Sequence, residues 1–300
     1  MYGVGVDELL LRSLLLEQHP DLAKLDLRLA ATGWDNQLWR LGDELAVRLP
    51  RTERGPSLLR KEHKWLPVLA PRLPLPVPVP VRMGEASGRF PMPWTITTWV
   101  PGEPCDRTPI TRGHHSAYIL AGFLQALHQA APHGAPVNPR RGVALDTLAD
   151  DFDATLRSIA SDHDTADLRK LWEEAVNAPE WQGPPIWLHG DLHPANVIVR
   201  EGTLAGVIDF GELNAGDPAT DLAAVWLLLP ADACARFFDA YGDADEATIR
   251  RARGWAIQLG ISLISVGQAW ERGLPGGQPT WGLAGRNTLD RVLATYHQSA

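Results

Sequence analysis

The sequence predicts an α+β fold in which strands are concentrated in the first third of the chain and helices dominate the remainder. Three observations support this prediction. Alternating or β-branched apolar segments occur in the first third, apolar residues recur at helical spacing in most of the later sequence, and two short apolar runs near residue 200 are separated by a turn. A hydrophobic share of 45% is enough for one large domain or two lobes.

The composition argues against several classes of partner. A formal net charge of −8 disfavours nucleic acid and an anionic membrane surface. Cys105 and Cys234 lie far apart and fit no metal-binding spacing, so we expect free thiols in a reducing compartment. The sequence shows neither a signal peptide nor an apolar stretch long enough to span a bilayer, and we therefore expect a cytoplasmic protein.

The first third of the chain predicts a helix, strands and a second helix. Leucines at helical spacing predict a helix over 7–19, and residues 25–29 alternate as in a strand. Two further strands, 38–41 and 45–49, flank a Gly-Asp-Glu turn, and a helix is expected over 57–69.

Prolines interrupt this pattern. Residues 73–80 alternate proline with leucine or valine, which predicts a stiff, extended connector because proline lacks an amide donor and restricts the residue before it. A proline-rich partner-binding motif is the alternative. Residues 94–100 are rich in strand formers, and the Pro-Gly-Glu-Pro sequence at 101–104 ends this strand.

Helical segments dominate the rest of the chain. His128 is expected in the core or at a helix end, and Asp164 as a helix N-cap. Asp150, Asp151 and Asp153 predict a solvated face, with a place in a substrate cleft as the alternative. The expected helices are 114–130, 146–160, 164–177, 220–229, 230–241, 246–271 and 285–298.

The most informative stretch contains Asp191 and Asn196 and is followed by Asp209-Phe210-Gly211. An Asp and an Asn with four residues between them, followed by Asp-Phe-Gly, form the motif set of phosphoryl-transfer enzymes. Such transfer needs a carboxylate to position the acceptor hydroxyl and take its proton, and oxygen ligands for Mg²⁺. Asp191 suits the first role, whereas Asn196 and Asp209 suit the second. The apolar runs 197–199 and 204–208 predict a hairpin between the two metal ligands.

His189-x-Asp191-x-His193 admits two other interpretations. These residue types could form a transition-metal site of a hydrolase, but that hypothesis leaves Asn196 and the Asp-Phe-Gly sequence unexplained. Alternatively, both histidines are structural residues of a tight loop, and this is the interpretation we prefer for them.

The stretch His-Gly-Asp-Leu-His-Pro-Ala-Asn-Val at 189–197 with Ile-Asp-Phe-Gly-Glu at 208–212 resembles the aminoglycoside phosphotransferase family of the kinase-like superfamily. The sequences at 216–223, 33–36 and 45–50 extend the resemblance over most of the chain. It implies a bilobal, protein-kinase-like fold. Residues 1–98 would form a nucleotide-binding N-lobe with an antiparallel sheet, and 99–300 a mainly helical C-lobe with the catalytic loop, the metal site and acceptor-binding helices.

The resemblance also implies a nucleotide site, with ATP in preference to GTP, together with Mg²⁺. Arg48 occupies the place of the phosphate-binding lysine of kinases, and a Glu of the next helix should be its partner. Glu62 is the expected partner, with Glu53 as second choice and a surface ion pair as the alternative role. The remaining expected nucleotide contacts are a loop with Gly33 and Asn36, and a hinge with the Thr98 carbonyl and the Val100 amide.

His189, Glu212 and Asp217 are expected to support the catalytic loop or to contact the acceptor, and for Asp217 we favour support. No long activation segment or Ala-Pro-Glu motif follows Asp-Phe-Gly, which argues against a protein kinase. The expected partner is a small-molecule hydroxyl acceptor, with the protein a monomer or homodimer. An aminoglycoside-type antibiotic is the first expectation, and macrolides, other antibiotics, sugars and amino alcohols are alternatives. A catalytically inactive nucleotide-binding module is a further hypothesis, motivated by Arg48.

Overall fold

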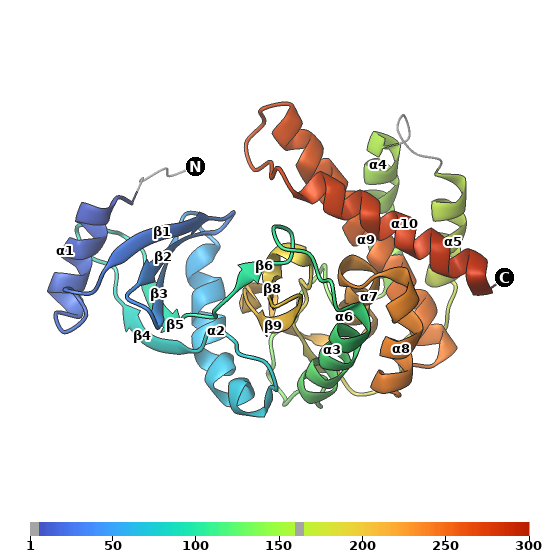
Figure 1. Cartoon of the computed structure of the whole chain (residues 1–300), viewed down its shortest axis with the longest axis horizontal. Coiled ribbons are helices and arrows are strands. Elements are labelled where there is room, and N and C mark those ends of the chain that lie inside the picture. Colours follow the sequence, from blue (N-terminus) through green and yellow to red (C-terminus); the bar gives the residue numbers. More distant parts are fainter. Residues whose placement is uncertain (1–5, 160–164, 300) are drawn as a thin grey trace. The chain divides into compact units, whose positions relative to one another are not determined.

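The chain divides into two compact units. The computed structural model describes residues 6–159 and 165–299. The chain leaves unit 1 briefly after Pro71 and again after Pro101, and it returns to unit 1 for the short segment that carries Asp209. Unit 1 consists of Met1–Pro71, Pro76–Pro101 and Val207–Gly211, and unit 2 of Arg72–Leu75, Gly102–Gly206 and Glu212–Ala300 (Figure 1).

Unit 1 is built on a five-stranded antiparallel sheet. In the middle of the sheet, the register places Arg48 opposite Leu38 on one side and Thr95 on the other. A strand that begins at a proline lies at one edge, where a missing amide donor is tolerated. The strands are β1 (Leu27–Thr32), β2 (Asn36–Leu41), β3 (Leu45–Pro50), β4 (Pro80–Gly84) and β5 (Trp94–Thr98), in the order β1-β2-β3-β5-β4.

Two helices, α1 (Glu8–Gln18) and α2 (Gly55–Leu69), complete unit 1, and the 3₁₀ helix η1 (Ala70–Arg72) follows α2. The carboxylate of Asp7 caps α1 by accepting a hydrogen bond from the Leu10 amide at 2.8 Å. α2 buries Leu59, Glu62, Leu66 and Leu69 on one stripe, so a single carboxylate lies in an otherwise apolar face. The core of the sheet and α1 contains Leu11, Leu14, Leu15, Trp39, Leu41, Val47, Leu49, Phe90, Trp94 and Ile96.

Unit 2 is mainly helical and is organised around α9 (Glu246–Glu271), which contacts α4, α5, α6, α7 and α10 (Figure 1). Most residues of α9 between its first and last turns are buried, as expected for a helix covered on more than one face. The other helices are α3 (Gly113–Leu127), α4 (Ala149–Ile159), α5 (Ala166–Val176), α6 (Ala219–Leu222), α7 (Ala224–Leu228), α8 (Ala231–Tyr241), α10 (Trp281–Ser299) and the 3₁₀ helix η2 (Leu145–Leu148).

Two small sheets in unit 2 hold the loops with the predicted site residues. β7 (Ile186–Leu188) pairs with β10 (Asn214–Gly216), and β8 (Val197–Arg200) lies between β6 (Glu103–Pro104) and β9 (Thr203–Val207). Glu201 and Gly202 both have positive φ, at 54° and 76°, and form the tight turn of the β8–β9 hairpin. The 3₁₀ helices η3 (Pro194–Asn196) and η4 (Phe210–Glu212) lie before β8 and after β9.

Several elements differ from the sequence predictions. The helix expected over 220–229 is two short helices, and the Trp226 amide bonds the Ala223 carbonyl three residues back rather than four. α10 begins at Trp281, whereas the expected helix began at residue 285. The edge strand β4 was not predicted, since prolines obscure the apolar pattern before it. Asp164, the expected N-cap, lies outside the described residues.

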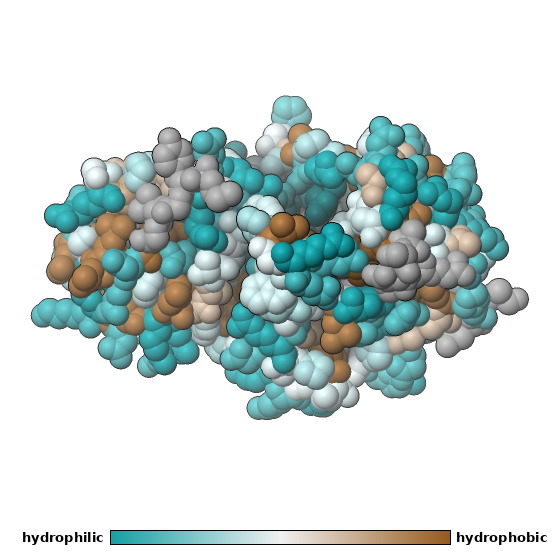
Figure 2. Space-filling view, turned by 90° about the horizontal axis from the view of Figure 1, so that it is seen from above, coloured by the Kyte–Doolittle hydropathy of each residue, from teal (hydrophilic) through white to brown (hydrophobic). Residues whose placement is uncertain are grey.

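The surface is largely hydrophilic, as Figure 2 shows for one face. Large hydrophobic side chains are exposed singly along the chain, among them Leu9, Val137 and Leu283. Within the described ranges, no helix is both long and apolar enough to cross a bilayer.

Candidate active site

The loop between β7 and β8, residues 189–196, is held by one buried carboxylate. Asp221 of α6 accepts hydrogen bonds from the backbone amides of His189 at 2.7 Å and Gly190 at 2.8 Å. Gly190 has a φ of 82°, and a Cβ there would lie 2.7 Å from the carbonyl oxygen of Glu212. Only glycine suits this left-handed position beside a close backbone neighbour. The loop is therefore fixed where it delivers Asp191.

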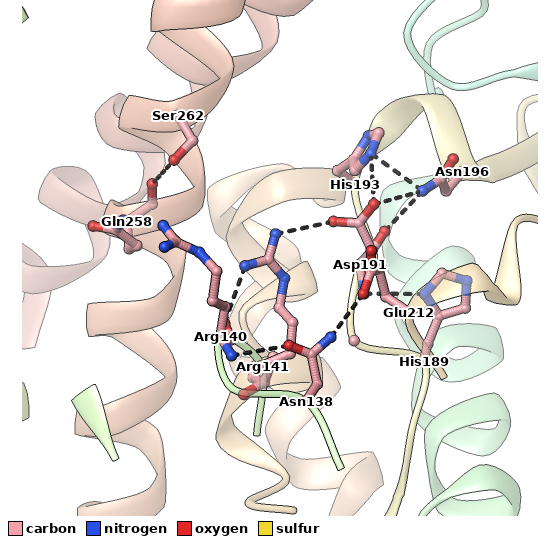
Figure 3. Close-up of polar contacts among 12 residues, drawn as sticks. Asn138, Arg140, Arg141, His189, Asp191, His193, Asn196, Glu212, Gln258 and Ser262 are labelled. Atoms are coloured by element: carbon pink, nitrogen blue, oxygen red, sulfur yellow. Dashed lines mark hydrogen bonds and ion pairs between the residues drawn. The ribbon is translucent and has the colours of Figure 1, made fainter. Parts of the chain in front are cut away.

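The carboxylate of Asp191 has a polar neighbour at each oxygen and keeps 27% of its side chain exposed (Figure 3). Oδ2 lies 3.3 Å from the amide nitrogen of Asn196 and 3.4 Å from Nε2 of His193, and Oδ1 lies 3.4 Å from Nη2 of Arg141. Burial alone would raise the pKa of Asp191, but His193 and Arg141 outweigh this effect and hold the pKa well below its usual range. The carboxylate is therefore ionised at neutral pH.

The two histidines of the loop bind its backbone. Nδ1 of His189 accepts the amide hydrogen of Asp191 at 3.2 Å, and Nδ1 of His193 accepts that of Ala195 at 3.3 Å. Both side chains are buried. In the part of the chain that the structure describes, no three His, Cys, Asp or Glu residues form a group able to hold a metal ion.

Asn196 closes the loop at the end of η3. Its amide nitrogen donates to the carbonyl oxygen of Asp191 at 3.0 Å and to the carboxylate at 3.3 Å. These bonds leave the amide oxygen of Asn196 for another partner. Amide and carboxylate oxygens are the ligands that Mg²⁺ prefers, so the orientation of Asn196 fits a metal ligand.

The other expected metal ligand, Asp209, belongs to unit 1 and has an unusual backbone conformation. Its φ is 61°, in the left-handed region that non-glycine residues rarely adopt and that recurs at functional sites. Oδ1 of Asp209 lies 3.1 Å from Nη2 of Arg48, and 52% of the side chain is exposed. A half-exposed carboxylate with one oxygen engaged keeps the other for a hard cation, which fits Mg²⁺.

Arg48 of β3 lies between two carboxylates of unit 1. It forms a close ion pair with Glu62 of α2, the partner expected from the sequence, and a second pair with Asp209. Arg48 is 6% exposed and Glu62 is 1% exposed. Burial alone would lower the pKa of Arg48, but the charges of Glu62 and Asp209 outweigh this effect and raise it. The guanidinium is therefore a fixed, permanent cation.

The other residues expected at the nucleotide also lie in unit 1. Gly33 and Asn36 bound the turn from β1 to β2, where the Gly33 amide donates to the Asn36 carbonyl at 2.9 Å. Thr98 ends β5, and its hydroxyl donates to the Val77 carbonyl at 3.3 Å. Val100 follows, and its backbone amide forms no hydrogen bond with the described residues. A free amide at this position fits the expected contact to adenine.

Glu212 and Asp217 have separate places in unit 2. Oε2 of Glu212 accepts a hydrogen bond from Asn138 at 2.7 Å. Asp217 is buried and accepts hydrogen bonds from Nε and Nη2 of Arg251 at 2.7 and 3.2 Å, and from the Ala219 amide at 3.0 Å. A carboxylate satisfied in this way fits the support of nearby structure that we favoured for Asp217.

Sequence reasoning missed the contacts of two residues around this loop. Arg141 lies between two expected helices, 114–130 and 146–160, where no site residue was predicted. The Asn-Pro-Arg-Arg-Gly sequence at 138–142 is the signal that could have drawn attention to it. His128, expected only as a core or helix-end residue, lies 3.3 Å from Asp221 and 2.9 Å from the hydroxyl of Tyr241. Neither contact of His128 can be inferred from sequence spacing.

The fold, the Arg48–Glu62 pair of unit 1 and the loop with Asp191 and Asn196 in unit 2 together define a class of protein. An antiparallel sheet with a buried Arg–Glu pair, followed by a helical part with an Asp-x₄-Asn loop, is the architecture of kinase-like phosphotransferases. The model of the phosphotransferase enzyme family matches residues 26–255. The chain belongs to this family, and the family resemblance and the fold class predicted from the sequence are confirmed.

Curated relatives share part of the chain. An aminoglycoside 3'-phosphotransferase of Escherichia coli is 29% identical over 141 residues, covering 44% of this chain and 51% of the relative. The corresponding protein of Salmonella typhimurium matches with the same identity and coverage. The chain thus spans about half the length of the curated relatives it matches.

Solved structures share the fold over nearly the whole chain. The GDP complex of an aminoglycoside 2'-phosphotransferase-IIIa has a TM-score of 0.69 at 20% identity, covering 97% of this chain and 100% of that chain. A macrolide 2'-phosphotransferase from Brachybacterium faecium has a TM-score of 0.62 at 20% identity, covering 91% of this chain and 97% of that chain.

Proposed function

We propose that the protein is an ATP-dependent O-phosphotransferase that transfers the γ-phosphate to a hydroxyl group of a small molecule. The observation that carries this proposal is the environment of Asp191. Its carboxylate is ionised, partly exposed and fixed by Asn196 and by a loop that Asp221 anchors. An ionised carboxylate that is fixed and partly exposed can position an acceptor hydroxyl and accept its proton as the phosphoryl group is transferred.

Each residue has a separate task in the proposed reaction. Asp191 orients the acceptor hydroxyl and takes its proton while the hydroxyl oxygen attacks the γ-phosphorus and the bond to the ADP oxygen breaks. Arg48, positioned by Glu62, binds the inner phosphates of ATP through its forked donors. The Val100 amide and the Thr98 carbonyl bind adenine, and the turn with Gly33 and Asn36 contacts the phosphates.

We further propose that Asn196 and Asp209 hold Mg²⁺, with phosphate oxygens and water as the remaining ligands. When bound, the cation neutralises the triphosphate charge that opposes attack. The donor chemistry of both residues supports this assignment. ATP and Mg²⁺ are both cytoplasmic, and we propose that location, with the protein a monomer or homodimer that acts without nucleic acid or membrane.

The acceptor class follows from the relatives by analogy. Two curated relatives are aminoglycoside 3'-phosphotransferases and one structural neighbour is a macrolide 2'-phosphotransferase. We therefore propose an antibiotic hydroxyl as the acceptor, an aminoglycoside first and a macrolide second, and a role in antibiotic resistance. Sugars and amino alcohols remain in the test panel.

The experiment is an ATP-consumption screen with Mg²⁺ over aminoglycosides, macrolides, amino sugars and choline-like alcohols. The Asp191→Ala protein serves as the blank, because loss of the base abolishes transfer and leaves Arg48 and Glu62 in place. Turnover that is present in the wild-type protein and absent in the blank supports the proposal. Unchanged turnover in the blank refutes the role of Asp191, and nucleotide binding without turnover on any acceptor supports an inactive binding module.

A further inference from the structure

The turn Asn138–Gly142 lies beside Asp191 and has no task in the reaction proposed above. It is anchored at both ends: the Asn138 amide donates to Glu212 at 2.7 Å, and the backbone amide of Gly142 donates to the hydroxyl of Thr220 at 3.0 Å. Residues 138 and 141 form an isolated antiparallel bridge. The turn is therefore a built element of unit 2.

Gly142 shows how closely the turn packs on the sheet that carries the catalytic loop. Its φ is 70°, and a Cβ there would lie 2.7 Å from Cδ1 of Leu188 in β7 and 2.9 Å from Oδ1 of Asn214 in β10. The left-handed conformation and the close approach both require glycine. This packing fixes the preceding residue, Arg141, relative to the loop with Asp191.

The side chain of Arg141 points from the turn toward Asp191 (Figure 3). Nη2 lies 3.4 Å from Oδ1 of Asp191, and Nη1 donates to the Arg140 carbonyl at 3.1 Å. Nε is buried without a hydrogen-bond partner in the described chain, and 25% of the side chain is exposed. A guanidinium has five N–H donors, and this one is not held in a close bidentate pair. It therefore retains donors for a ligand.

The carboxylates around the turn already have partners. Glu212 accepts the hydrogen bond from Asn138, and Asp151 forms an ion pair with Arg140. An acceptor hydroxyl must come within about 2.6–3.2 Å of an oxygen of Asp191 to give up its proton. A substituent on the next carbon of the acceptor then comes within reach of Arg141. An ammonium at that position meets a like charge, whereas an oxygen meets a donor.

We infer that the turn 138–142 is an acceptor subsite in which Arg141 binds an oxygen-bearing group on the carbon next to the reacting hydroxyl. The group is a second hydroxyl, a carbonyl or a carboxylate, and not an ammonium. This inference rests on the proposed function, because it takes Asp191 as the base. An aminoglycoside fits the subsite through a ring hydroxyl whose neighbouring substituent is an oxygen.

The test compares three ring alcohols that differ only in the substituent next to the hydroxyl. trans-Cyclohexane-1,2-diol carries a second hydroxyl there, trans-2-aminocyclohexanol an ammonium, and trans-2-hydroxycyclohexanecarboxylate a carboxylate. Binding to the full chain is titrated by NMR in the presence of Mg²⁺ and a non-hydrolysable ATP analogue. We expect the diol and the carboxylate to bind roughly tenfold more tightly than the amino alcohol, as one charge-assisted hydrogen bond predicts. Tighter binding of the carboxylate than of the diol would identify an anionic group as the preferred ligand.

Substitutions at Arg141 and Arg140 test whether Arg141 causes this preference among the probes. Arg141→Gln should remove it, and Arg141→Lys should retain part of it because the charge remains. Arg140→Gln is the matched control: it removes the same charge from the neighbouring position, where the ion pair with Asp151 is 60% and 46% exposed. We expect Arg140→Gln to keep the wild-type order of the probes.

Three results would overturn the inference: binding of the amino alcohol by the wild-type protein that is as tight as that of the diol or tighter, binding of none of the probes, or equal loss of the preference in the Arg140 and Arg141 variants. The last result would mean that the overall positive electrostatic potential of the turn, and not a contact of Arg141, causes the preference. Since the readout needs no phosphate transfer, failure of the proposed function is seen separately, as unchanged ATP turnover in Asp191→Ala.

Discussion

Replacing Glu62 by alanine removes the closest partner of Arg48 and leaves a buried guanidinium only partly compensated. Arg48 is 6% exposed, and its remaining partner, Asp209, is half exposed at 3.1 Å. Breaking a buried ion pair by removing one member costs about 3–5 kcal/mol. Because Asp209 still faces Arg48, we expect a loss near the lower limit, about 3 kcal/mol in the free energy of unfolding.

Urea denaturation of wild-type and Glu62→Ala proteins measures this loss. Glu53→Ala is the matched control, since Glu53 is exposed and precedes the same helix, and its replacement should change stability by less than about 0.5 kcal/mol. In the absence of acceptor, Glu62→Ala should also weaken Mg·ATP binding, because Arg48 loses the group that orients it.

A double variant separates stability from nucleotide binding. Arg48→Met with Glu62→Met replaces the pair by apolar side chains, and such replacements are often neutral or stabilising. We expect the double variant to recover most of the stability lost in Glu62→Ala and to bind no Mg·ATP. A loss below about 1 kcal/mol in Glu62→Ala, or a double variant as unstable as the single one, would refute the buried-pair reasoning.

Three further predictions concern unit 2. In thermal melts, Gly190→Ala should destabilise the protein by more than about 1 kcal/mol, because a φ of 82° and the Glu212 carbonyl at 2.7 Å both oppose a Cβ. Gly122→Ala is the control and should be neutral or stabilising, since Gly122 lies in the middle of α3 with open space where the Cβ would be. Asp221→Asn should lower kcat at least about tenfold with KM for ATP unchanged, because the His189 and Gly190 amides each bond one oxygen of this carboxylate and an asparagine offers only one oxygen. Steady-state kinetics that show only a KM change would contradict this. The pKa of Asp191 is lowered on folding, so its ionised form stabilises the protein at neutral pH, and this contribution is lost as pH falls from the usual Asp range toward the lowered value. Urea denaturation at several pH values measures the stability difference between wild type and Asp191→Asn, which should become smaller toward acid pH. A difference that becomes larger toward acid pH would refute the sign of this effect.

Local sequence signals predicted the elements best where one period or one turn dominates. The alternation of β2 and β3 around Gly42, and the long apolar pattern of α9, were sufficient to place these elements closely. The Asp-x₄-Asn spacing identified Asp191 and Asn196 because both lie on one short loop. Glu62 was identifiable because a helix directly after β3 had few acidic candidates.

The remaining features depend on contacts between residues far apart in the chain. Arg141 reaches Asp191 across 50 positions, and Asp221 reaches the amides of residues 189 and 190 across more than 30. No periodicity encodes such contacts, since they arise from the way the turns and small sheets of unit 2 pack. The prolines before β4 similarly conceal a strand whose place at the sheet edge makes them tolerable.

The return of Val207–Gly211 to unit 1 has a consequence for how the protein is made. Arg48 gains its second partner, Asp209, from a residue 161 positions further along the chain. On the ribosome, the sheet and α2 therefore emerge long before the segment that completes their charge balance. Until the hairpin of β8 and β9 and the residues directly after it have been synthesised, Glu62 is the only one of the two carboxylates that is available to Arg48. A nascent chain that ends before residue 209 lacks one of the two carboxylates that face Arg48, so the group proposed to bind phosphate is completed only late in synthesis.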